Sequence, residues 1–388
     1  MKVTVIGATS QSTPALFRSL ADSPCLRDLQ FTVVARNVER LEAIARAIDM
    51  VGKGEFNIER SDCSRIGLAC ALDRADVVVI QVRYGGLEGR EFDESFPCEF
   101  GACGDEGLGP GGLSAAWRAW PHLNGLLEQI QQSCPVAKVL LLTSPAGILT
   151  RLANFCWPNL QVKAFCELPW TTLQNFNHQQ AEASYDYLGI NHLGWIYNLA
   201  GRDPFPLKYW RLDTERDQVI REQRCRNKSR AAELKLLTES ALRAYASGSI
   251  AEINAAIDSR CAPWYSHALA PLLESMISHQ SNIHFFFSEP NMGWNQSFAD
   301  NDVLEIPSYW DHGQLIRRPA RSVPPGNLVK TLTPFVVYEH IATRAVLVRE
   351  KLALEDALEH HPWVTNRANA RGLASAIVAG HLECEVLQ

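Results

Sequence analysis

An α/β fold built on a parallel sheet is the class that the sequence predicts, and three observations support it. Short apolar strands alternate with helices through the first half of the chain. Most of these strands are almost continuously apolar, as expected when both faces of a sheet are covered. A glycine turn follows the first strand and opens the first helix. Together these patterns predict a Rossmann-type, doubly wound parallel sheet, in which ligands bind at the carboxyl ends of the strands.

The first half supplies the elements of this sheet. Pro14 suits the first turn of a helix, and apolar spacing extends that helix to residue 20. The expected strands are Val3–Ile6, Phe31–Ala35, Ala75–Ile80, Val139–Leu142 and Val162–Phe165, and the expected helices are Thr13–Leu20 and Val38–Ile48.

The pattern changes after about residue 190, where long charged helices and shorter strands are mixed. This change predicts an α+β C-terminal lobe, so the chain divides into residues 1–190 and residues 191–388. The expected helices are Arg211–Ala246, Trp264–Ile277, Leu328–Leu358 and Asn366–Ala379, and the expected strands are Leu193–Leu199, Ile283–Phe287 and Val303–Ile306.

Composition and charge exclude several classes of protein. A formal charge of -6 over 388 residues gives no basis for binding nucleic acid or an anionic membrane. The apolar runs are too short to span a bilayer, and a strand from Lys2 leaves no room for a signal peptide. Eleven cysteines without a repeating spacing indicate reduced thiols, so we expect a cytoplasmic protein.

The turn "GATSQSTP", Gly7 to Pro14, is the candidate site for a dinucleotide pyrophosphate. Only Gly7 remains of the G-x-G-x-x-G pattern, so the alternative is a plain strand-to-helix turn. The hydroxyl side chains that can donate to a phosphate are those of Thr9, Ser10, Ser12 and Thr13.

The end of the second strand bears on which dinucleotide is bound. An enzyme that uses NAD usually has an acid there for the ribose hydroxyls, but this chain has Ala35, Arg36 and Asn37. Arg36 is either a solvated surface arginine or a partner for the 2′-phosphate of NADP. Both NAD and NADP therefore stay open.

The glycine-rich segment from Gln81 to Gly112 is too long for a simple connector, which indicates a functional role. It resembles glycoside hydrolase family 4, which has a run R-x-G-G-L-x-x-R-x-x-D-E followed by G-x-x-G-x-E-x-x-G-P-G-G. The matching residues are Arg83, Gly85, Gly86, Leu87, Arg90, Asp93, Glu94, Gly101, Gly104, Glu106, Gly109, Pro110, Gly111 and Gly112.

Four further stretches extend the resemblance over nearly the whole chain. They are "TSPAG" at residues 143–147, "CELP" at 166–169, "GINHLGW" at 189–195 and "EIPSY" at 305–309. The resemblance implies a lactate/malate dehydrogenase-like Rossmann fold. Residues 1–190 would bind the dinucleotide, and residues 191–388 would serve substrate, metal and oligomer contacts.

The resemblance also implies cofactors and a reaction. NAD would accept a hydride from C3 of a sugar, a base would remove the C2 proton, and the aglycone would leave before water and hydride return. Cys166 and His192 would hold manganese or another divalent metal, which suits a thiolate and an imidazole. Gln81 and Arg83 would contact the dinucleotide. The expected partner is a sugar or glycoside, in a homo-oligomeric enzyme such as a dimer or tetramer.

Several residues depart from the family pattern. Ser144 replaces a substrate-binding asparagine, and Glu167 stands where asparagine or aspartate is usual, as a candidate general acid. The family's tyrosine base is shifted, so Tyr209 is the candidate, with Tyr84 and Tyr265 as alternatives.

The remaining substrate contacts follow from the same resemblance. Glu106 and Asn191 are expected near the sugar, and Arg90 and Arg230 are candidates for a 6-phosphate because arginine binds phosphate in a bidentate manner. The departures keep two alternatives open: a sugar or hydroxy-acid dehydrogenase, epimerase or lyase, and a non-catalytic sensor.

Overall fold

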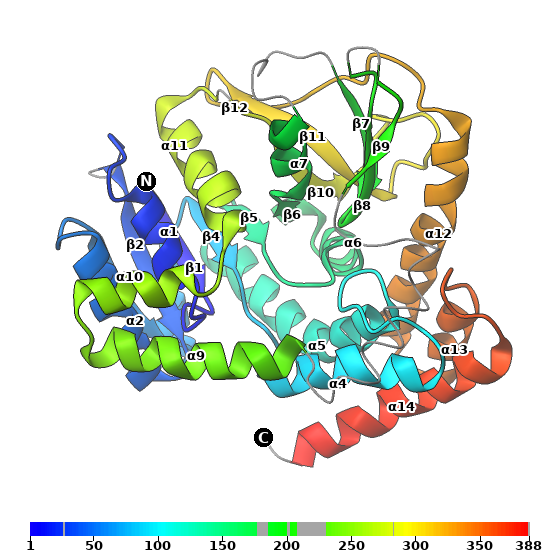
Figure 1. The fold of residues 1–388 in the computed structure, drawn as a ribbon, viewed down its shortest axis with the longest axis horizontal. Coiled ribbons are helices and arrows are strands. Elements are labelled where there is room, and N and C mark those ends of the chain that lie inside the picture. The colour runs from blue at the N-terminus through cyan, green and yellow to red at the C-terminus, as the bar shows by residue number, and fades with distance from the viewer. Residues whose placement is uncertain (26–27, 177–184, 200–201, 208–229, 282, 387–388) are drawn as a thin grey trace.

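The computed structural model describes residues 1–25, 28–176, 185–199, 202–207, 230–281 and 283–386. Its centre is a nine-stranded sheet in the order β12-β11-β10-β6-β5-β4-β1-β2-β3 (Figure 1). Strands β1 to β6 are mutually parallel, and their order 3-2-1-4-5-6 is that of a Rossmann fold. The predicted fold class is confirmed.

The first half matches the predicted order of elements. Strand β3 was not predicted because its sequence, NIERSD, is polar and largely exposed at the edge of the sheet. Helix α4 lies inside the segment 81–112, which looked like a long loop. The elements are β1 Lys2–Ile6, α1 Thr13–Leu20, β2 Gln30–Ala35, α2 Val38–Val51, β3 Asn57–Asp62, α3 Arg65–Leu72, β4 Val77–Ile80, α4 Gly86–Glu99, α5 Pro110–Ser133, β5 Lys138–Leu141, α6 Ala146–Cys156, a 3₁₀ turn Pro158–Leu160, β6 Lys163–Cys166 and α7 Leu168–Phe176.

The second half combines helices with two groups of strands. Strands β7, β8 and β9 form a separate antiparallel sheet, whereas β10, β11 and β12 extend the main sheet from β6. The predicted helix over 264–277 is confirmed from residue 265, but its first turn is a π-helix, Tyr265–Leu269. The other elements are β7 Asp186–Ile190, β8 Leu193–Tyr197, β9 Phe205–Pro206, α9 Arg230–Ser247, α10 Ile250–Asp258, α11 Ala270–Ser278, β10 Phe285–Pro290, β11 Val303–Asp311, β12 Gln314–Arg317, α12 Gly326–Val348, α13 Lys351–Glu359 and α14 Arg367–Val386.

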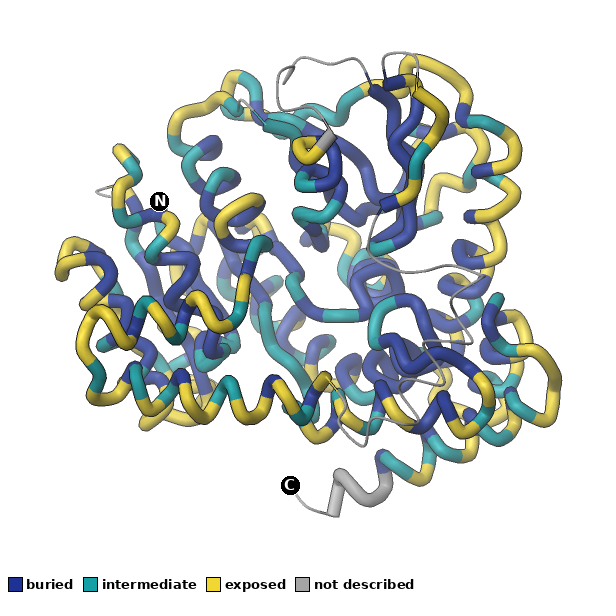
Figure 2. The backbone as a smooth tube through the Cα atoms, viewed as in Figure 1, coloured by how far each residue is buried: buried dark blue, intermediate teal, exposed yellow. Residues whose placement is uncertain are grey.

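Alternation along the parallel strands places apolar side chains on both faces of the sheet. Val77 and Val79 pack with α1, α2 and α11, while Val78 and Ile80 pack with α5, α6 and α12. This is the period of two expected of a strand, and both faces are apolar because helices cover both. Figure 2 shows the central strands buried and the outer sides of the surrounding helices exposed.

The two halves share the main sheet, because β10 pairs antiparallel with β6. The division at residues 190 and 191 stays a prediction. Nine cysteines in the described ranges are free thiols, in agreement with the expected reduced state. In the part of the chain that the structure describes, no helix combines the length and apolar character needed to cross a bilayer.

Candidate active site

A cavity of about 600 Å³ opens at the carboxyl ends of the central parallel strands. Its wall begins at the turn after β1 and the end of β2, continues along residues 81–88, and ends at residues 142–144 and 260–265. Rossmann folds bind ligands at this edge of the sheet. The cavity therefore lies where the sequence predicts a site, and it is the starting point for placing the candidate residues.

Gly7 allows the chain to turn sharply after β1. Its φ angle is +88°, and an added Cβ would lie 3.0 Å from the Cγ2 atom and the backbone nitrogen of Val82. Any other residue would be strained there, because residues other than glycine disfavour a positive φ angle and Val82 leaves no space for a Cβ atom. Gly7, Thr9 and Ser10 line the cavity, as predicted for a dinucleotide turn.

Ser12 and Thr13 occupy a different position from these three residues. Both are buried behind the turn, at 3% and 0% exposure, and are not part of the cavity wall. The Thr13 hydroxyl accepts a hydrogen bond from Nε2 of Gln81 at 2.9 Å. Thr13 thus supports Gln81 rather than facing a ligand directly.

Gln81 joins three segments at the centre of the cavity. Its Nε2 also donates to the carbonyl oxygen of Gly7 at 3.3 Å, and its Oε1 accepts from the hydroxyl of Tyr265 at 2.6 Å. The side chain is therefore held on both ends, and its orientation is fixed relative to the turn. Tyr265 lines the same cavity.

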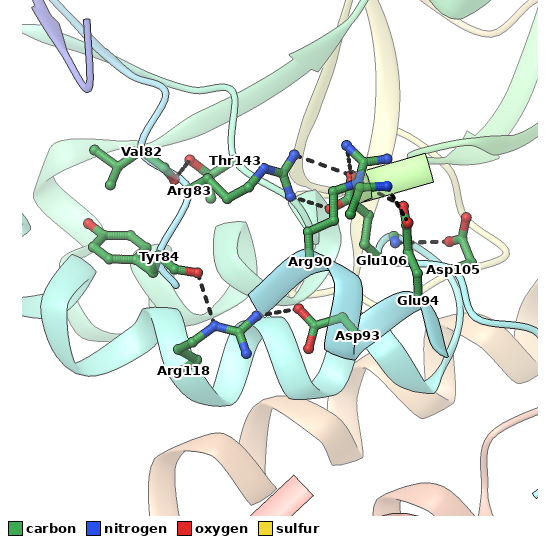
Figure 3. Close-up of polar contacts among 12 residues, drawn as sticks. Val82, Arg83, Tyr84, Arg90, Asp93, Glu94, Asp105, Glu106, Arg118 and Thr143 are labelled. Carbon is green, nitrogen blue, oxygen red and sulfur yellow. Dashed lines mark hydrogen bonds and ion pairs between the residues drawn. The ribbon is translucent and has the colours of Figure 1, made fainter. Parts of the chain in front are cut away.

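Arg83, in the cavity wall, forms an ion-pair network with Glu106 and Arg90, which lie outside that wall and are largely buried (Figure 3). Arg83 donates to both Glu106 oxygens, one of them at 3.3 Å from Nη2, and Nη1 of Arg90 lies 3.2 Å from Oε1 of Glu106. Nε of Arg90 also donates to Glu94 at 2.7 Å. Burial raises the pKa of Glu106, but the two guanidinium groups outweigh burial and lower it overall.

Arg118 explains why the same segment contains so many glycines. Its Nε donates to the carbonyl oxygen of Tyr84 at 2.9 Å, and its Nη2 pairs with Asp93 (Figure 3). A Cβ on Gly85 would lie 2.5 Å from Nε of Arg118. Glycine at position 85 therefore leaves room for the buried Arg118 side chain, which holds the loop against α5.

Cys166 ends β6 and is buried beside two carboxyl groups. Its Sγ accepts a hydrogen bond from the backbone nitrogen of Leu168 at 3.5 Å and lies 3.6 Å from Oε2 of Glu167. Burial, followed by the charges of Glu167 and Glu305, raises the pKa of the Cys166 thiol well above its usual range. Burial also raises the pKa of Glu167, so this carboxyl retains its proton more readily than an exposed one.

His192 lies in the turn between β7 and β8, with a φ angle of +67°. Burial lowers the pKa of its imidazole to about 4, although the charge of Glu106 opposes this shift. The ring is therefore neutral at physiological pH, the state in which an imidazole binds metal. The neighbouring Asn191 lowers the pKa of Glu305 by a hydrogen bond, and the charge of Glu305 acts in turn on Cys166.

Comparison with known proteins shows a similarity to one enzyme family. The sequence model of the family 4 glycosyl hydrolases matches residues 2–181. A 6-phospho-beta-glucosidase of Thermotoga maritima is 24% identical over 427 aligned residues, with 99% of each chain covered. A 6-phospho-alpha-glucosidase of Lacticaseibacillus paracasei is 27% identical over 55% of this chain and 52% of its own length.

This chain is thus similar to the family 4 glycosyl hydrolases over residues 2–181. A solved structure of the Thermotoga maritima 6-phospho-beta glucosidase with manganese, NAD⁺ and glucose-6-phosphate has the same fold. Its TM-score is 0.87 at 22% sequence identity, and the match covers 99% of this chain and 98% of that chain.

The other predicted residues fall in three places. Arg36 and Ser144 line the cavity, Ser144 next to Thr143, whose hydroxyl donates to the carbonyl oxygen of Val82 at 3.0 Å. Arg230 is exposed at the start of α9 and pairs with Glu233. Tyr209 lies outside the described residues.

The residues that would hold a metal fit only part of a coordination sphere. Within the described ranges, no group of three or more histidine, cysteine, aspartate or glutamate side chains is arranged for a metal ion. Cys166 and His192 are two donors of suitable chemistry on two separate turns. Such a pair fits a site that takes its other ligands from substrate and water, as the family resemblance implies.

Four residues of the site were missed or given too little weight in the sequence. Gln11 is buried in the cavity wall, and neither polar atom of its side chain meets a partner within the described residues. Arg260 and Tyr265 reach the cavity from the far end of the sequence, and Glu305 is buried at 0% exposure. Glu305 alone gave a signal, since it is a charge inside an apolar strand.

Proposed function

We propose that this chain is a glycosidase that depends on a nicotinamide dinucleotide, NAD or NADP, and on a divalent metal, and that acts on a 6-phosphorylated glycoside. The observation that carries this proposal is one continuous cavity, from the Gly7 turn and Arg36 to Ser144 and Arg260. Its volume of about 600 Å³ matches a ligand site, for which about 300–1,000 Å³ is typical. The names of the relatives and the ligands in the solved structure support the same substrate class.

The proposed dinucleotide site follows from the cavity wall, whereas the proposed metal ligands, Cys166 and His192, lie outside that wall. NAD supplies reversible hydride transfer when bound, and its pyrophosphate fits the turn of Gly7 and Ser10, where the amide of Gln11 offers a donor. Cys166 and His192 would hold a divalent metal, which polarises sugar hydroxyl groups when it is present. The buried Cys166 thiol must lose its proton to become a ligand.

The acid and base are assigned to separate side chains. Glu167 is proposed as the general acid, because its raised pKa keeps a proton available beside Cys166. Tyr209 remains the proposed base. Ser144 and Asn191 are proposed to orient sugar hydroxyl groups, and Glu106 to hold the arginines of the substrate side in place.

A positive charge in the cavity favours an anionic substrate. Arg83 and Arg90 are balanced by Glu106 and Glu94, but Arg260 makes no ion pair among the described residues. Its guanidinium lies 5.6 Å from the Trp264 ring centre. Burial and the charges of the two other arginines lower the pKa of Arg260 to about 10, so it is still charged at neutral pH. A sugar phosphate would supply the missing counter-charge.

The reaction is tested by proton NMR in D₂O with manganese, NAD or NADP, and matched glycosides with and without a 6-phosphate. We expect loss of the C2 proton signal together with aglycone release, for phosphorylated substrates only. Reduced nicotinamide that accumulates in proportion to substrate would indicate a dehydrogenase instead. Exchange without cleavage would indicate an epimerase, and tight binding without either would indicate a sensor.

The metal assignment has its own test. Cys166→Ser should abolish metal-dependent turnover and lower the manganese that copurifies with the protein, because a serine hydroxyl is a much weaker ligand. Cys156→Ser, a partly buried cysteine at the end of α6, is the matched control. Equal manganese content and turnover in the two variants would contradict a ligand role for Cys166.

We also propose a cytoplasmic enzyme that forms a homo-oligomer. The free thiols support the location, because reduced cysteines persist in reducing compartments. Light scattering coupled to size exclusion measures the assembly. A mass equal to the 43.2 kDa chain across the working concentration range would contradict an oligomer.

A further inference from the structure

The end of β2 differs from the usual NAD-binding pattern in charge. In a Rossmann fold the strand at this position normally ends in Asp or Glu, which bonds the ribose hydroxyls of NAD. Here the strand ends at Ala35, and Arg36 and Asn37 follow. Arg36 thus directly follows the strand end at which a Rossmann fold receives the adenosine ribose of its dinucleotide.

Arg36 lies in the wall of the cavity. Ala35, Arg36, Asn37 and Arg40 line one end of it together with Cys63, which follows β3. The charge of Arg36 acts on both Cys63 and Tyr84, so the guanidinium lies on the cavity side of the strand end. The side chain is exposed and can therefore reach a bound nucleotide.

Most of the nearby acidic side chains are engaged elsewhere. Glu239 also lines the cavity, where its charge acts on Lys235, and Glu39 in the first turn of α2 lies outside the cavity wall. Asp62 pairs in register with Ala35 across β3, but its carboxylate accepts from the backbone nitrogen of Ser64 at 2.8 Å and lies outside the cavity wall. Glu88 lines the cavity and is paired with Lys235 at 3.0 Å. In the described ranges Arg36 has no ion pair, so this end of the cavity is positive.

The first turn of α2 adds to this charge. Oδ1 of Asn37 accepts from the backbone nitrogen of Arg40 at 2.8 Å and so caps the helix. The capped helix directs its positive end toward the same region, and the guanidinium of Arg40 adds a second charge, part of which acts on Glu88. An anion is favoured here, and a ribose diol gains no acceptor from a carboxylate.

We propose that this chain binds NADP in preference to NAD, with Arg36 as the residue that selects the 2′-phosphate. The planar guanidinium can donate two parallel hydrogen bonds to phosphate oxygens, whereas the 2′-hydroxyl of NAD offers only a weak, neutral acceptor. This inference rests on the proposed function, because it assumes that the cavity takes a nicotinamide dinucleotide. It assigns the form of the cofactor from the residues of this chain.

Isothermal titration calorimetry with NADP⁺ and with NAD⁺ tests the proposal without any need for turnover. We expect the unaltered protein to bind NADP⁺ about tenfold or more tightly than NAD⁺. Arg36→Ala should remove most of that difference by weakening NADP⁺ alone, and Arg36→Asp should reverse the preference. Arg74→Ala, an exposed arginine outside the cavity and paired with Asp73, should leave both constants unchanged.

The salt dependence of binding gives an independent measurement. Because Arg36 is exposed, the preference for NADP⁺ should shrink as ionic strength rises from about 0.05 to 0.5 M. Tighter binding of NAD⁺, or equal weakening of both dinucleotides by Arg36→Ala, would overturn the proposal and leave the proposed function intact. If the unaltered protein binds neither dinucleotide, the proposed function fails as well.

Discussion

The turn from Gly7 to Thr13 and the segment from Gln81 to Gly112 build the two sides of one cavity by different means. The turn contains no charged side chain, and its shape comes from the backbone of Gly7 packed on Val82. The segment depends on charged side chains, which are buried and paired with one another. A backbone site tolerates many sequences, whereas a charged network requires particular residues at particular positions.

This difference explains how easily each region can be recognised from the sequence. Only Gly7 of the nucleotide pattern was recognisable, yet the turn lies in the expected place. The charged segment gave the specific family resemblance, because each arginine needs its carboxylate and Gly85 and Gly89 leave room for Arg118. The two regions meet at Gln81, so a substitution in one region should affect the other.

The largest effect is expected from the charged region. Glu106→Gln leaves Arg83 and Arg90 without their shared carboxylate, and breaking a buried ion pair costs about 3–5 kcal/mol. Urea unfolding should show a loss of about 3 kcal/mol, and turnover should fall at least about 100-fold. Thr9→Ala in the backbone-built turn is the comparison, with an expected loss below about 1 kcal/mol. Equal losses would remove the distinction between the two regions.

Gly7→Ala tests whether the turn depends on the backbone. The new methyl group would meet Val82 at 3.0 Å, and the φ angle of +88° is strained for alanine. We expect a loss of about 2 kcal/mol in stability and weaker dinucleotide binding. Gly125→Ala, within helix α5 with nothing near the added atom, should be stabilised by about 0.5–1 kcal/mol instead. A neutral Gly7→Ala would mean that the turn can rearrange.

Tyr265→Phe tests the contact between the two regions. It removes the hydroxyl that donates to Gln81 at 2.6 Å and leaves the amide of Gln81 less restrained. Stability should fall by about 1 kcal/mol, and the dissociation constant for the dinucleotide should rise several-fold. Titration calorimetry measures the constant. Tyr245→Phe, which loses a bond to the Gln11 carbonyl at 2.8 Å, separates the loss of one hydrogen bond from the effect on Gln81.

A further prediction is a pH dependence that belongs to the charged segment. Burial raises the pKa of Asp105 from 3.8 to about 6, despite hydrogen bonds from the backbone nitrogens of Leu108 and Gly107. The folded state therefore binds more protons than the unfolded state between about pH 4 and 6. The stability that Asp105 contributes is complete below pH 4 and declines as the pH rises through 6. Asp105→Asn should flatten this part of a plot of unfolding free energy against pH, while Asp73→Asn, on an exposed residue, should not.

The parts of the fold that the sequence predicted are those set by local pattern. Apolar strands such as Val77–Ile80 can be recognised in the sequence because both their faces are buried. Strand β3 was not predicted, because the sequence of an edge strand with a polar face resembles that of a loop. Helix α4 was not predicted, because Gly86, Gly89 and Pro97 are poor helix formers. In the folded chain, tertiary packing overrides their low helix propensity.

The site was predicted in the same uneven way. Residues at strand ends, such as Gly7, Gln81 and Arg83, line the cavity because a parallel sheet brings its strand ends together. Arg260 and Tyr265 come from a helical segment with no motif, and only the folded chain shows that they face the cavity. Arg230, a candidate for a 6-phosphate, is exposed and paired with Glu233, and its charge acts on Arg260 in the cavity wall, so its role stays a prediction.

The pairing of β10 with β6 has a consequence for how the protein folds. Cys166 is aligned with Phe286 across this pair, so the strand that carries Cys166 gains its outer neighbour from a distant part of the chain. Long-range pairings form late, because closing a large loop costs entropy before any contact compensates for it. A ribosome that has released only the first half of the chain would expose β6 as a bare sheet edge, prone to pair with other chains. A chaperone that shields this edge until residue 290 has emerged would then determine how much of the enzyme reaches its folded state.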